Sequence, residues 1–298
     1  MAKKKKNKPA PRLRRRSCGT MGVHMMLLEK YPSFRARQFK LEQEYARRRA
    51  KPVSLAKLST ATIKVVVNVV YNTAEQNISA AQINSQIGTL NRDFGATNPD
   101  KSRVPAVWTG LVTNARIKFK LFKTTRTQSN VTSFTADDGV KAASSGGIAP
   151  YQPQKYLNLW VCPLGDGLLG YAQFPGGPSA TDGVVINYKA FGTTGTASAP
   201  FDLGRTATHE VGHYFNLRHI WGDTEDCSGS DMVADTPNCA GPNYKKPTFP
   251  TVTCNNGPNG DMFVNYMDYV DDKAMFMFTA QQVTRMRTTL DGPRSGLK

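Results

Sequence analysis

The chain has 298 residues, of which 39% are hydrophobic and five are cysteines. This length and composition support one large domain or two small ones with a sizeable core. No run approaches the roughly 18 consecutive apolar residues of a membrane-spanning helix, so we expect no membrane span. The low, odd number of cysteines excludes a small scaffold built from disulfides.

The positive charge of the chain is concentrated at its N-terminus. Residues 1–51 contain 17 Lys or Arg and 3 Glu, whereas the remaining 247 residues contain 22 basic and 19 acidic residues. A run such as KKKKNKPAPRLRRR is typical of a solvated segment. It has no interleaved aromatic residues, so we expect no specific nucleic-acid binding. It also lacks the apolar segment of about 7–15 residues that a secretory signal requires, and no signal peptide is visible.

The fall in charge density indicates a domain boundary near residues 51–60. We therefore divide the chain into a basic N-terminal segment, 1–55, and a main domain, 56–298. In the first segment, FRARQFKLEQEYARRRA predicts a helix that begins at Ser33. The arginines at 47–49, with Lys51 and Pro52, indicate an exposed connector.

The main domain begins with strands around one helix. TIKVVVNVVY (62–71) is a β-branched run typical of a strand buried on both faces. Ser79 and Gln82 form a capping-box pattern before apolar residues at helical spacing. Further strands at 116–122, 156–161, 170–174 and 183–188 precede a C-terminal helix at roughly 279–290. The order predicts an α/β or α+β sandwich, with a long irregular region between residues 223 and 259.

The segment HEVGHYFNLRH, residues 209–219, holds three of the four histidines of the chain. His209 and His213 are four residues apart and share one face of a helix. With Glu210 they form H-E-x-x-H, in which two imidazoles bind zinc and the glutamate acts on a bound water. A chance pair on an exposed helix does not account for three histidines so close together, so we predict a zinc site.

A straight helix cannot bring His219 to the same ion. Ten residues of helix span roughly 15 Å along the axis, whereas two zinc-ligand atoms lie at most about 4 Å apart. The helix must therefore end between His213 and His219, and Asn216, which tolerates the left-handed conformation, is the predicted turn. Three histidines leave a fourth position for water, as in a catalytic zinc site, and Glu210 would take the proton of that water.

HEVGHYFNLRH resembles the extended zinc motif of the metzincin metalloproteases, H-E-x-x-H-x-x-G-x-x-H, with Asn216 in place of the glycine. DMVADTPN, PNGDMFVNYMDYVDD and MFTAQQVTRM are similar to the pappalysin, or cytophagalysin-like, branch. The resemblance implies a twisted, mostly parallel sheet with backing helices, an irregular C-terminal subdomain, and zinc in the cleft between them. It also implies that an extended substrate pairs in antiparallel fashion with the edge strand GYAQF.

The resemblance assigns roles to residues after the zinc motif. Met267, in NYMDY, would lie beneath the zinc as the Met-turn, and Tyr269 would hydrogen-bond the oxyanion of the intermediate. A plain core residue is the alternative for each. Asp271 and Asp272 follow where the wall of the specificity pocket is expected, and an acidic wall would favour Arg or Lys after the scissile bond. The alternative is that these carboxylates face solvent.

The resemblance also implies different roles for the five cysteines. Cys227 and Cys254 match a disulfide of the family, which leaves Cys239 and the strand residue Cys162 as free thiols. Cys18 lies in RRSCGT, in a segment that resembles the family's pro-segment. There its thiolate would occupy the open position of the zinc, and the neighbouring arginines would favour the anion. Cleavage near residues 47–51 would relieve this cysteine switch; the alternative is a surface cysteine without a role.

Oxygen-bearing side chains of the irregular region form a second candidate metal site. Asp226, Asp231, Asp235 and Thr236 have the ligand chemistry of calcium, which related enzymes bind there, whereas ordinary turn chemistry is the alternative.

We therefore expect a monomeric, extracellular zinc endopeptidase that is made as a latent precursor and acts on protein or peptide substrates. Export is expected from the family and the disulfide. The alternative is a non-catalytic binding protein stabilised by zinc, but neither Glu210 nor Tyr269 is needed merely to hold the ion.

Overall fold

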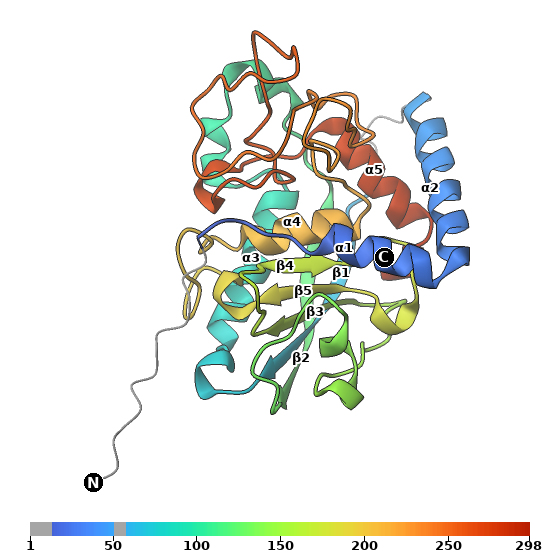
Figure 1. Ribbon diagram of the computed structural model, residues 1–298, viewed down its shortest axis with the longest axis vertical. Coiled ribbons are helices and arrows are strands. Elements are labelled where there is room, and N and C mark those ends of the chain that lie inside the picture. Colours follow the sequence, from blue (N-terminus) through green and yellow to red (C-terminus); the bar gives the residue numbers. More distant parts are fainter. Residues whose placement is uncertain (1–13, 51–57) are drawn as a thin grey trace.

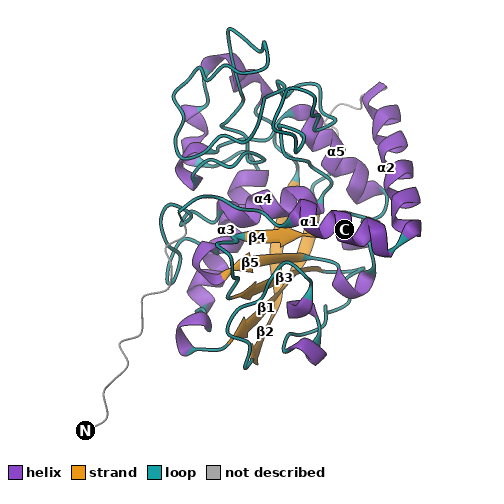
Figure 2. Ribbon diagram, viewed as in Figure 1, coloured by secondary structure: helices purple, strands orange, loops and turns teal. Residues whose placement is uncertain are grey.

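The structure, a computed structural model, describes residues 14–50 and 58–298. A five-stranded sheet occupies the lower part of the molecule in Figure 1, and loops dominate its upper part (Figure 2). The strands are β1 (Ala61–Tyr71), β2 (Ile117–Gln128), β3 (Leu157–Cys162), β4 (Gly170–Ala172) and β5 (Val184–Asn187). The α-helices are α1 (Thr20–Lys30), α2 (Pro32–Ala50), α3 (Ala80–Phe94), α4 (Arg205–Tyr214) and α5 (Ala280–Asp291).

The sheet is mostly parallel, as predicted. Its strand order is β2-β1-β3-β5-β4. β1 runs parallel to both β2 and β3, and β3 runs parallel to β5. β4 alone among these strands pairs in antiparallel fashion, with β5, and it forms one edge of the sheet. The edge strand therefore leaves one side of its backbone free for another extended segment.

Both faces of the sheet are covered. Alternate residues of β1, such as Ile63 and Val65, belong to a core that also contains apolar residues of α3 and α4. Val70 faces the other way and joins a second cluster with Trp160 of β3 and Val23 of α1. The prediction that β1 is buried on both faces is confirmed for residues 65–70, whereas Thr62 and Lys64 near its start are exposed.

The predicted cap of α3 is half correct. The side chain of Ser79 accepts a hydrogen bond from the backbone N–H of Gln82 (3.1 Å). The Gln82 amide does not return to the cap, however. It donates to the carbonyl oxygens of Tyr188 and Phe191, because these buried carbonyls have greater need of a donor than an exposed helix end.

The basic segment contributes two helices. α2 begins at Pro32, one residue before the predicted start, because proline is well suited to the first position of a helix. Arg47, Arg48 and Arg49 form its last turn and are not part of a connector. Lys51, Pro52 and the predicted boundary between residues 55 and 56 lie outside the described residues. α2 packs beside α5, at the opposite end of the chain (Figure 1).

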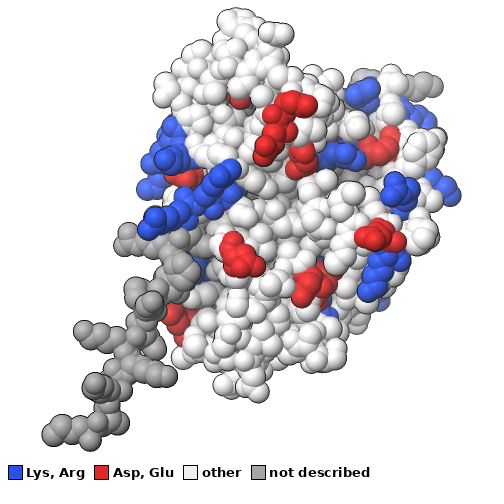
Figure 3. Space-filling model, viewed as in Figure 1, with Lys and Arg blue, Asp and Glu red and all other residues white. Residues whose placement is uncertain are grey.

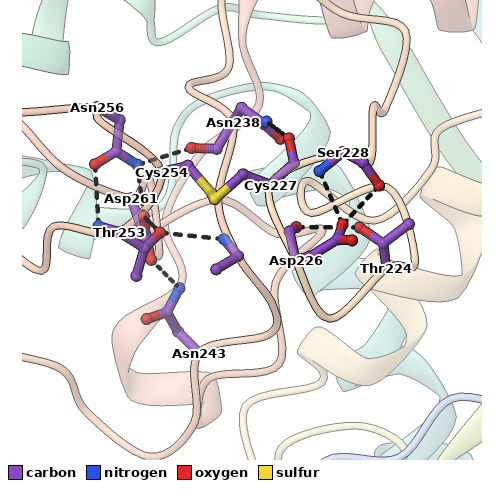
Figure 4. The surroundings of a disulfide bond; sticks show 11 residues. Thr224, Asp226, Cys227, Ser228, Asn238, Asn243, Thr253, Cys254, Asn256 and Asp261 are labelled. Atoms are coloured by element: carbon purple, nitrogen blue, oxygen red, sulfur yellow. Dashed lines mark hydrogen bonds between the residues drawn. A yellow bond between two sulfur atoms is a disulfide. The ribbon is translucent and has the colours of Figure 1, made fainter.

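The region between α4 and α5 is irregular, as predicted, and appears as loops in Figure 2. The disulfide joins Cys227 to Cys254 within it (Figure 4), while Cys162 and Cys239 are buried free thiols, so these cysteine predictions are confirmed. On the face shown in Figure 3, basic and acidic side chains are interspersed over a largely neutral surface, in keeping with the near balance of charges in the main domain. Among the described helices, none combines the length and apolarity that crossing a membrane requires.

Candidate active site

Helix α4 carries His209, Glu210 and His213 and is buried along its whole length. Its N-terminal end is fixed by ion pairs, because the Arg205 guanidinium contacts Asp100 (2.6 Å) and Asp93 (3.4 Å). Buried polar groups need such partners. The helix is therefore held rigidly at the residues that precede the first histidine.

The helix ends where the histidine spacing requires it to end. α4 stops at Tyr214, and Asn216 adopts φ +76°, in the left-handed region. The backbone N–H of Asn216 donates to the carbonyl of His213 (2.8 Å), and that of Leu217 donates to the carbonyl of Gly212 (3.0 Å). These bonds close the helix and reverse the chain, so the predicted turn at Asn216 is confirmed.

The turn brings the three imidazoles together. The Nε2 atom of His213 lies 3.1 Å from the Nε2 atoms of both His209 and His219, and the latter two are 3.3 Å apart. Ligand nitrogens around one tetrahedral zinc ion lie about 3.3 Å from one another. The spacing of these atoms is therefore that of a zinc site.

The other ring nitrogens determine which atoms can bind a metal. Nδ1 of His209 contacts the carbonyl oxygen of Tyr266 (2.7 Å), and Nδ1 of His213 contacts that of Leu217 (2.8 Å). A carbonyl only accepts, so both Nδ1 atoms carry the hydrogen and both Nε2 atoms present a lone pair. Nδ1 of His219 faces the carboxylate of Asp223.

Three such lone pairs aimed at one point repel one another unless a cation lies between them. Burial, together with the neighbouring imidazoles, lowers the pKa of His209 and His213 well below the ordinary value, so these two rings do not carry a second proton. The donor set therefore fits a zinc ion.

Glu210 lies beside the histidines and is fully buried. Burial raises the pKa of its carboxyl group to about 7. One of its oxygens accepts a hydrogen bond from the Thr20 hydroxyl (2.8 Å) and lies 3.4 Å from the Cys18 sulfur. A carboxyl group with this pKa can hold or release a proton near neutral pH.

The Cys18 sulfur completes the histidine cluster. Within the described residues, Cys18 and the three histidines form the one group of potential metal ligands whose ligand atoms all lie within 4.8 Å of one another. Burial and the charge of Glu210 raise the pKa of this thiol well above its ordinary value. Our prediction that arginines favour the thiolate is therefore wrong: Arg15 lies over Tyr244 and Arg16 reaches Asp272. The hydrogen bonds with Thr20 lower this pKa but do not outweigh burial, so a metal cation would be needed to favour the anion here.

The segment that carries Cys18 follows the edge strand β4 in parallel orientation, crossing in front of α4 (Figure 1). Three hydrogen bonds join the two: Leu169 N–H to Ser17 O (3.0 Å), Gly19 N–H to Gly170 O (2.9 Å) and Ala172 N–H to Thr20 Oγ1 (2.9 Å). These are the outward-facing groups that an extended peptide would use.

Met267 and Tyr269 both lie next to the histidine cluster. A methyl group added to Gly212, between the two helical histidines, would lie 2.5 Å from the Met267 sulfur, so this side chain packs directly beneath α4. The ring of Tyr269 contacts that of His219, with centroids 4.9 Å apart. These positions agree with the predicted roles without testing them.

The two acidic residues after the Met-turn lie in different surroundings. Asp272 is fully buried and pairs with Arg16 (2.6 Å), while its other oxygen accepts the backbone N–H of Leu203. Asp271 is partly exposed and lines a hollow with Arg14 to Arg16. Asp272 therefore does not face solvent, in contrast to the alternative considered from sequence.

The predicted calcium ligands are engaged separately. Asp226 accepts bonds from Ser228, Asp231 accepts bonds from Val233 and Thr236, and Asp235 accepts bonds from Thr279 and Gln281 at the start of α5. Calcium binding at these residues stays a prediction.

Several residues of the site were not found from the sequence. The Tyr266 carbonyl and Asp223 orient two histidines, Thr20 contacts Glu210, and Arg16 fills the pocket at Asp272. Asp223 had a local signal, since it lies four residues after His219. The contacts made by a backbone group, or between residues far apart in the sequence, had no such local signal.

Comparison with known proteins agrees with this geometry. The family described as pregnancy-associated plasma protein-A, peptidase family M43, matches residues 147–291. An extracellular metalloprotease of Arthroderma otae is 31% identical over 244 residues, which cover 79% of this chain and 80% of that protein. The chain belongs to the pappalysin family of metallopeptidases. A second extracellular metalloprotease, from Pyricularia oryzae, is 32% identical over 252 residues, covering 81% and 79% of the two chains.

Solved pappalysin structures share the fold. Mature mirolysin of Tannerella forsythia with a cleaved peptide superimposes with a TM-score of 0.79 at 49% identity, over 80% of this chain and 96% of that one. A mutant of promirolysin superimposes with a TM-score of 0.84 at 43% identity, over 95% and 97% of the two chains. The likeness to the pro form thus covers more of this chain than the likeness to the mature form.

Proposed function

We propose that this pappalysin is a zinc endopeptidase of the metzincin type in which His209, His213 and His219 bind the ion. The observation that carries the proposal is the convergence of three Nε2 lone pairs on one point, next to the buried carboxyl group of Glu210. The left-handed turn at Asn216 and Met267 beneath the helix support the metzincin assignment.

Zinc, when bound, would act as a Lewis acid that makes a water molecule acidic and polarises the peptide carbonyl. Glu210 would accept a proton from the attacking water and pass it to the leaving amine. Tyr269 would donate its phenolic hydrogen to the developing oxyanion. The β4 backbone would hold the substrate extended, so that the scissile bond lies between these groups.

We also propose that the N-terminal segment keeps the enzyme latent. The ligand atoms of Cys18 and the three histidines lie within 4.8 Å of one another, so the sulfur would take the place of the catalytic water, and nearby Thr20 contacts both the Glu210 carboxylate and the Ala172 N–H. The likeness to promirolysin, which extends over 95% of this chain, supports a precursor form. Cleavage near residues 47–51 would release the segment.

The pocket that holds Arg16 indicates which substrates the proposed peptidase would prefer. Asp272 pairs with the buried Arg16 guanidinium and Asp271 lines the hollow beside it, so this pocket would accept Arg or Lys after the scissile bond. A peptide library cleaved without a preference for basic residues at that position would refute this assignment.

The disulfide, together with relatives named as extracellular, supports secretion of this chain. A non-catalytic protein stabilised by zinc is the competing function. It offers no reason for a buried carboxyl group beside the histidines, because an unneeded buried acid costs stability.

One experiment tests the enzyme assignment. The full chain is purified, allowed to process itself, and assayed on casein, with Glu210→Ala as the matched variant. The proposal expects zinc in both proteins and chelator-sensitive proteolysis in the wild type alone. Zinc-loaded wild-type protein without proteolytic activity would instead establish the non-catalytic alternative.

The latency assignment has its own test. Cys18→Ala should be more active than the wild type before any cleavage is visible, because the segment then loses the sulfur that would occupy the metal's open position. Equal latency of this variant and the wild type would remove Cys18 from the mechanism.

A further inference from the structure

The basic segment makes a second specific contact next to the Asp272 pocket. The guanidinium carbon of Arg15 lies 3.7 Å from the centroid of the Tyr244 ring. This is well inside the distance of about 6 Å at which a cation is attracted by the face of an aromatic ring. Arg15 is otherwise exposed, so the ring is its main partner.

Tyr244 is a fixed part of the cleft. The next residue, Lys245, pairs with Val270, and its carbonyl accepts the N–H of Asp271 (2.8 Å). The preceding residue, Asn243, donates its backbone N–H to the Asp268 carboxylate (2.8 Å). The backbone on both sides of Tyr244 is therefore tied to the segment that contains Tyr269 and Asp272.

The disulfide loop supports this arrangement from behind (Figure 4). The Asn243 amide donates to Asp261 (3.2 Å), which also accepts bonds from Thr253 and Asn256 (both 2.6 Å). Thr253 immediately precedes Cys254 of the disulfide. A loop without regular secondary structure thus holds the Tyr244 segment through a continuous set of side-chain bonds.

The order of contacts defines two adjacent subsites. From Cys18 at the histidines, the chain places Arg16 against Asp272 and then Arg15 against Tyr244. Successive side chains of an extended chain point in opposite directions, so neighbouring residues enter different subsites. A substrate that runs antiparallel to β4 follows the same groove in the reverse direction, and its residues after the scissile bond pass Asp272 first and Tyr244 second.

The charges around Tyr244 bear on which group would favour a basic substrate side chain. The hollow beside the ring is lined by Arg14 to Arg16, Tyr244, Lys245 and Asp271. Without the N-terminal arginines, the lining keeps one lysine and one aspartate, and Lys246 adds a further positive charge near Asp271, so the side-chain charges do not favour a cation. The face of the Tyr244 ring is then the feature that favours a cation.

Resting on the proposed peptidase function, we propose that Tyr244 is a specificity-determining residue. Its ring would take an Arg or Lys side chain at the second position after the scissile bond. The preferred substrate would therefore carry two consecutive basic residues after the bond that is cut, the first at Asp272 and the second at Tyr244.

The test compares two quenched fluorescent peptides that differ only at the second residue after the scissile bond, Arg in one and norleucine in the other. Norleucine keeps the apolar stem and removes the charge. Full-length protein that has processed itself should cleave the Arg peptide with a kcat/KM about two- to fivefold higher, the range of an exposed cation–π contact. Tyr244→Leu should make the two values equal, whereas Tyr244→Phe, which keeps the ring, should preserve the ratio.

Equal cleavage of both peptides by the wild type would overturn the subsite and leave the peptidase function intact. A preference that survives in Tyr244→Leu but disappears in Asp271→Asn would also overturn it, because the carboxylate would then be the selector. Cleavage of neither peptide would refute the peptidase function and this subsite with it.

Discussion

Replacing Thr20 with valine tests whether latency depends on more than the Cys18 thiol. Valine has nearly the same shape as threonine but lacks the hydroxyl that donates to Glu210 (2.8 Å) and accepts from the Ala172 N–H (2.9 Å). Thr20 is fully buried, so in the closed form neither former partner would regain its bond from water. In the open form both partners are hydrated, and the substitution therefore destabilises the closed form alone.

The loss of stability of the closed form in Thr20→Val can be estimated from the two hydrogen bonds that the hydroxyl makes. A hydrogen bond to a charged group contributes about 1.5–3 kcal/mol, and a neutral one contributes about 0.5–1.5 kcal/mol. Together they predict a loss of roughly 2–4.5 kcal/mol from the closed form, which raises the open fraction roughly 30- to 2,000-fold. Activity tracks this fraction if opening and closing are fast relative to cleavage.

The assay is the initial rate of peptide hydrolysis by the intact precursor, before a gel shows any processing. Thr20→Ser is the matched control, because it keeps the hydroxyl. Cleavage near residues 47–51 removes position 20, so all processed forms should share one kcat/KM. Activity of Thr20→Val at the wild-type level, in a preparation where Cys18→Ala is active, would show that the hydroxyl has no part in latency.

Three other predictions follow from single contacts. Burial raises the pKa of Glu42, but the bond to and charge of Arg285 outweigh it, so the pKa of Glu42 is lowered. The stabilisation of the α2–α5 contact by Glu42 should therefore be complete above the ordinary pKa of glutamate and be lost as pH falls through the lowered value. The measurement is the opening of the precursor as a function of pH in the wild type and in Glu42→Gln. The same pH dependence in both proteins would contradict this prediction. Replacing Cys227 and Cys254 with serine should lower the free energy of unfolding by about 3–4 kcal/mol, measured in urea, and an unchanged midpoint would argue against that loop closure. Asn216→Val should cost about 1–2 kcal/mol and reduce bound zinc, whereas Asn216→Gly should retain it; equal zinc content in the two would refute the need for a left-handed turn.

The convergence of the three histidines could be predicted because its constraints are local. Two histidines four residues apart fix one helix face, and the position of His219 then requires a turn that only a few residue types tolerate. The strands were recognised for the same reason, since β-branched runs and alternation are local patterns. The cap of α3 shows the limit of this reasoning. Ser79 bonds within its own helix and was identified, whereas the Gln82 side chain bonds carbonyls more than 100 residues away.

The contacts of the N-terminal segment could not be predicted from local pattern. Arg16 pairs with Asp272 across 256 residues of sequence, and Thr20 contacts Glu210 across 190. The sequence supplied both charges of the first pair, and it suggested an acidic wall that favours arginine. It did not indicate that an arginine of the same chain fills that pocket. This is also why the thiolate argument for Cys18 failed, since the neighbouring arginines have partners elsewhere.

The position of these arginines would explain how a strongly basic segment keeps a nearly neutral domain latent, as we propose. Arg15 and Arg16 lie where the proposed substrate residues would lie, so the segment would compete with substrate for the same groups. A tethered ligand has an effective concentration in the millimolar range, and modest contacts are then enough to keep the cleft filled. The proposed cut near residues 47–51 would remove the tether without altering any contact in the cleft. The same segment would then become a dilute ligand that substrate can displace.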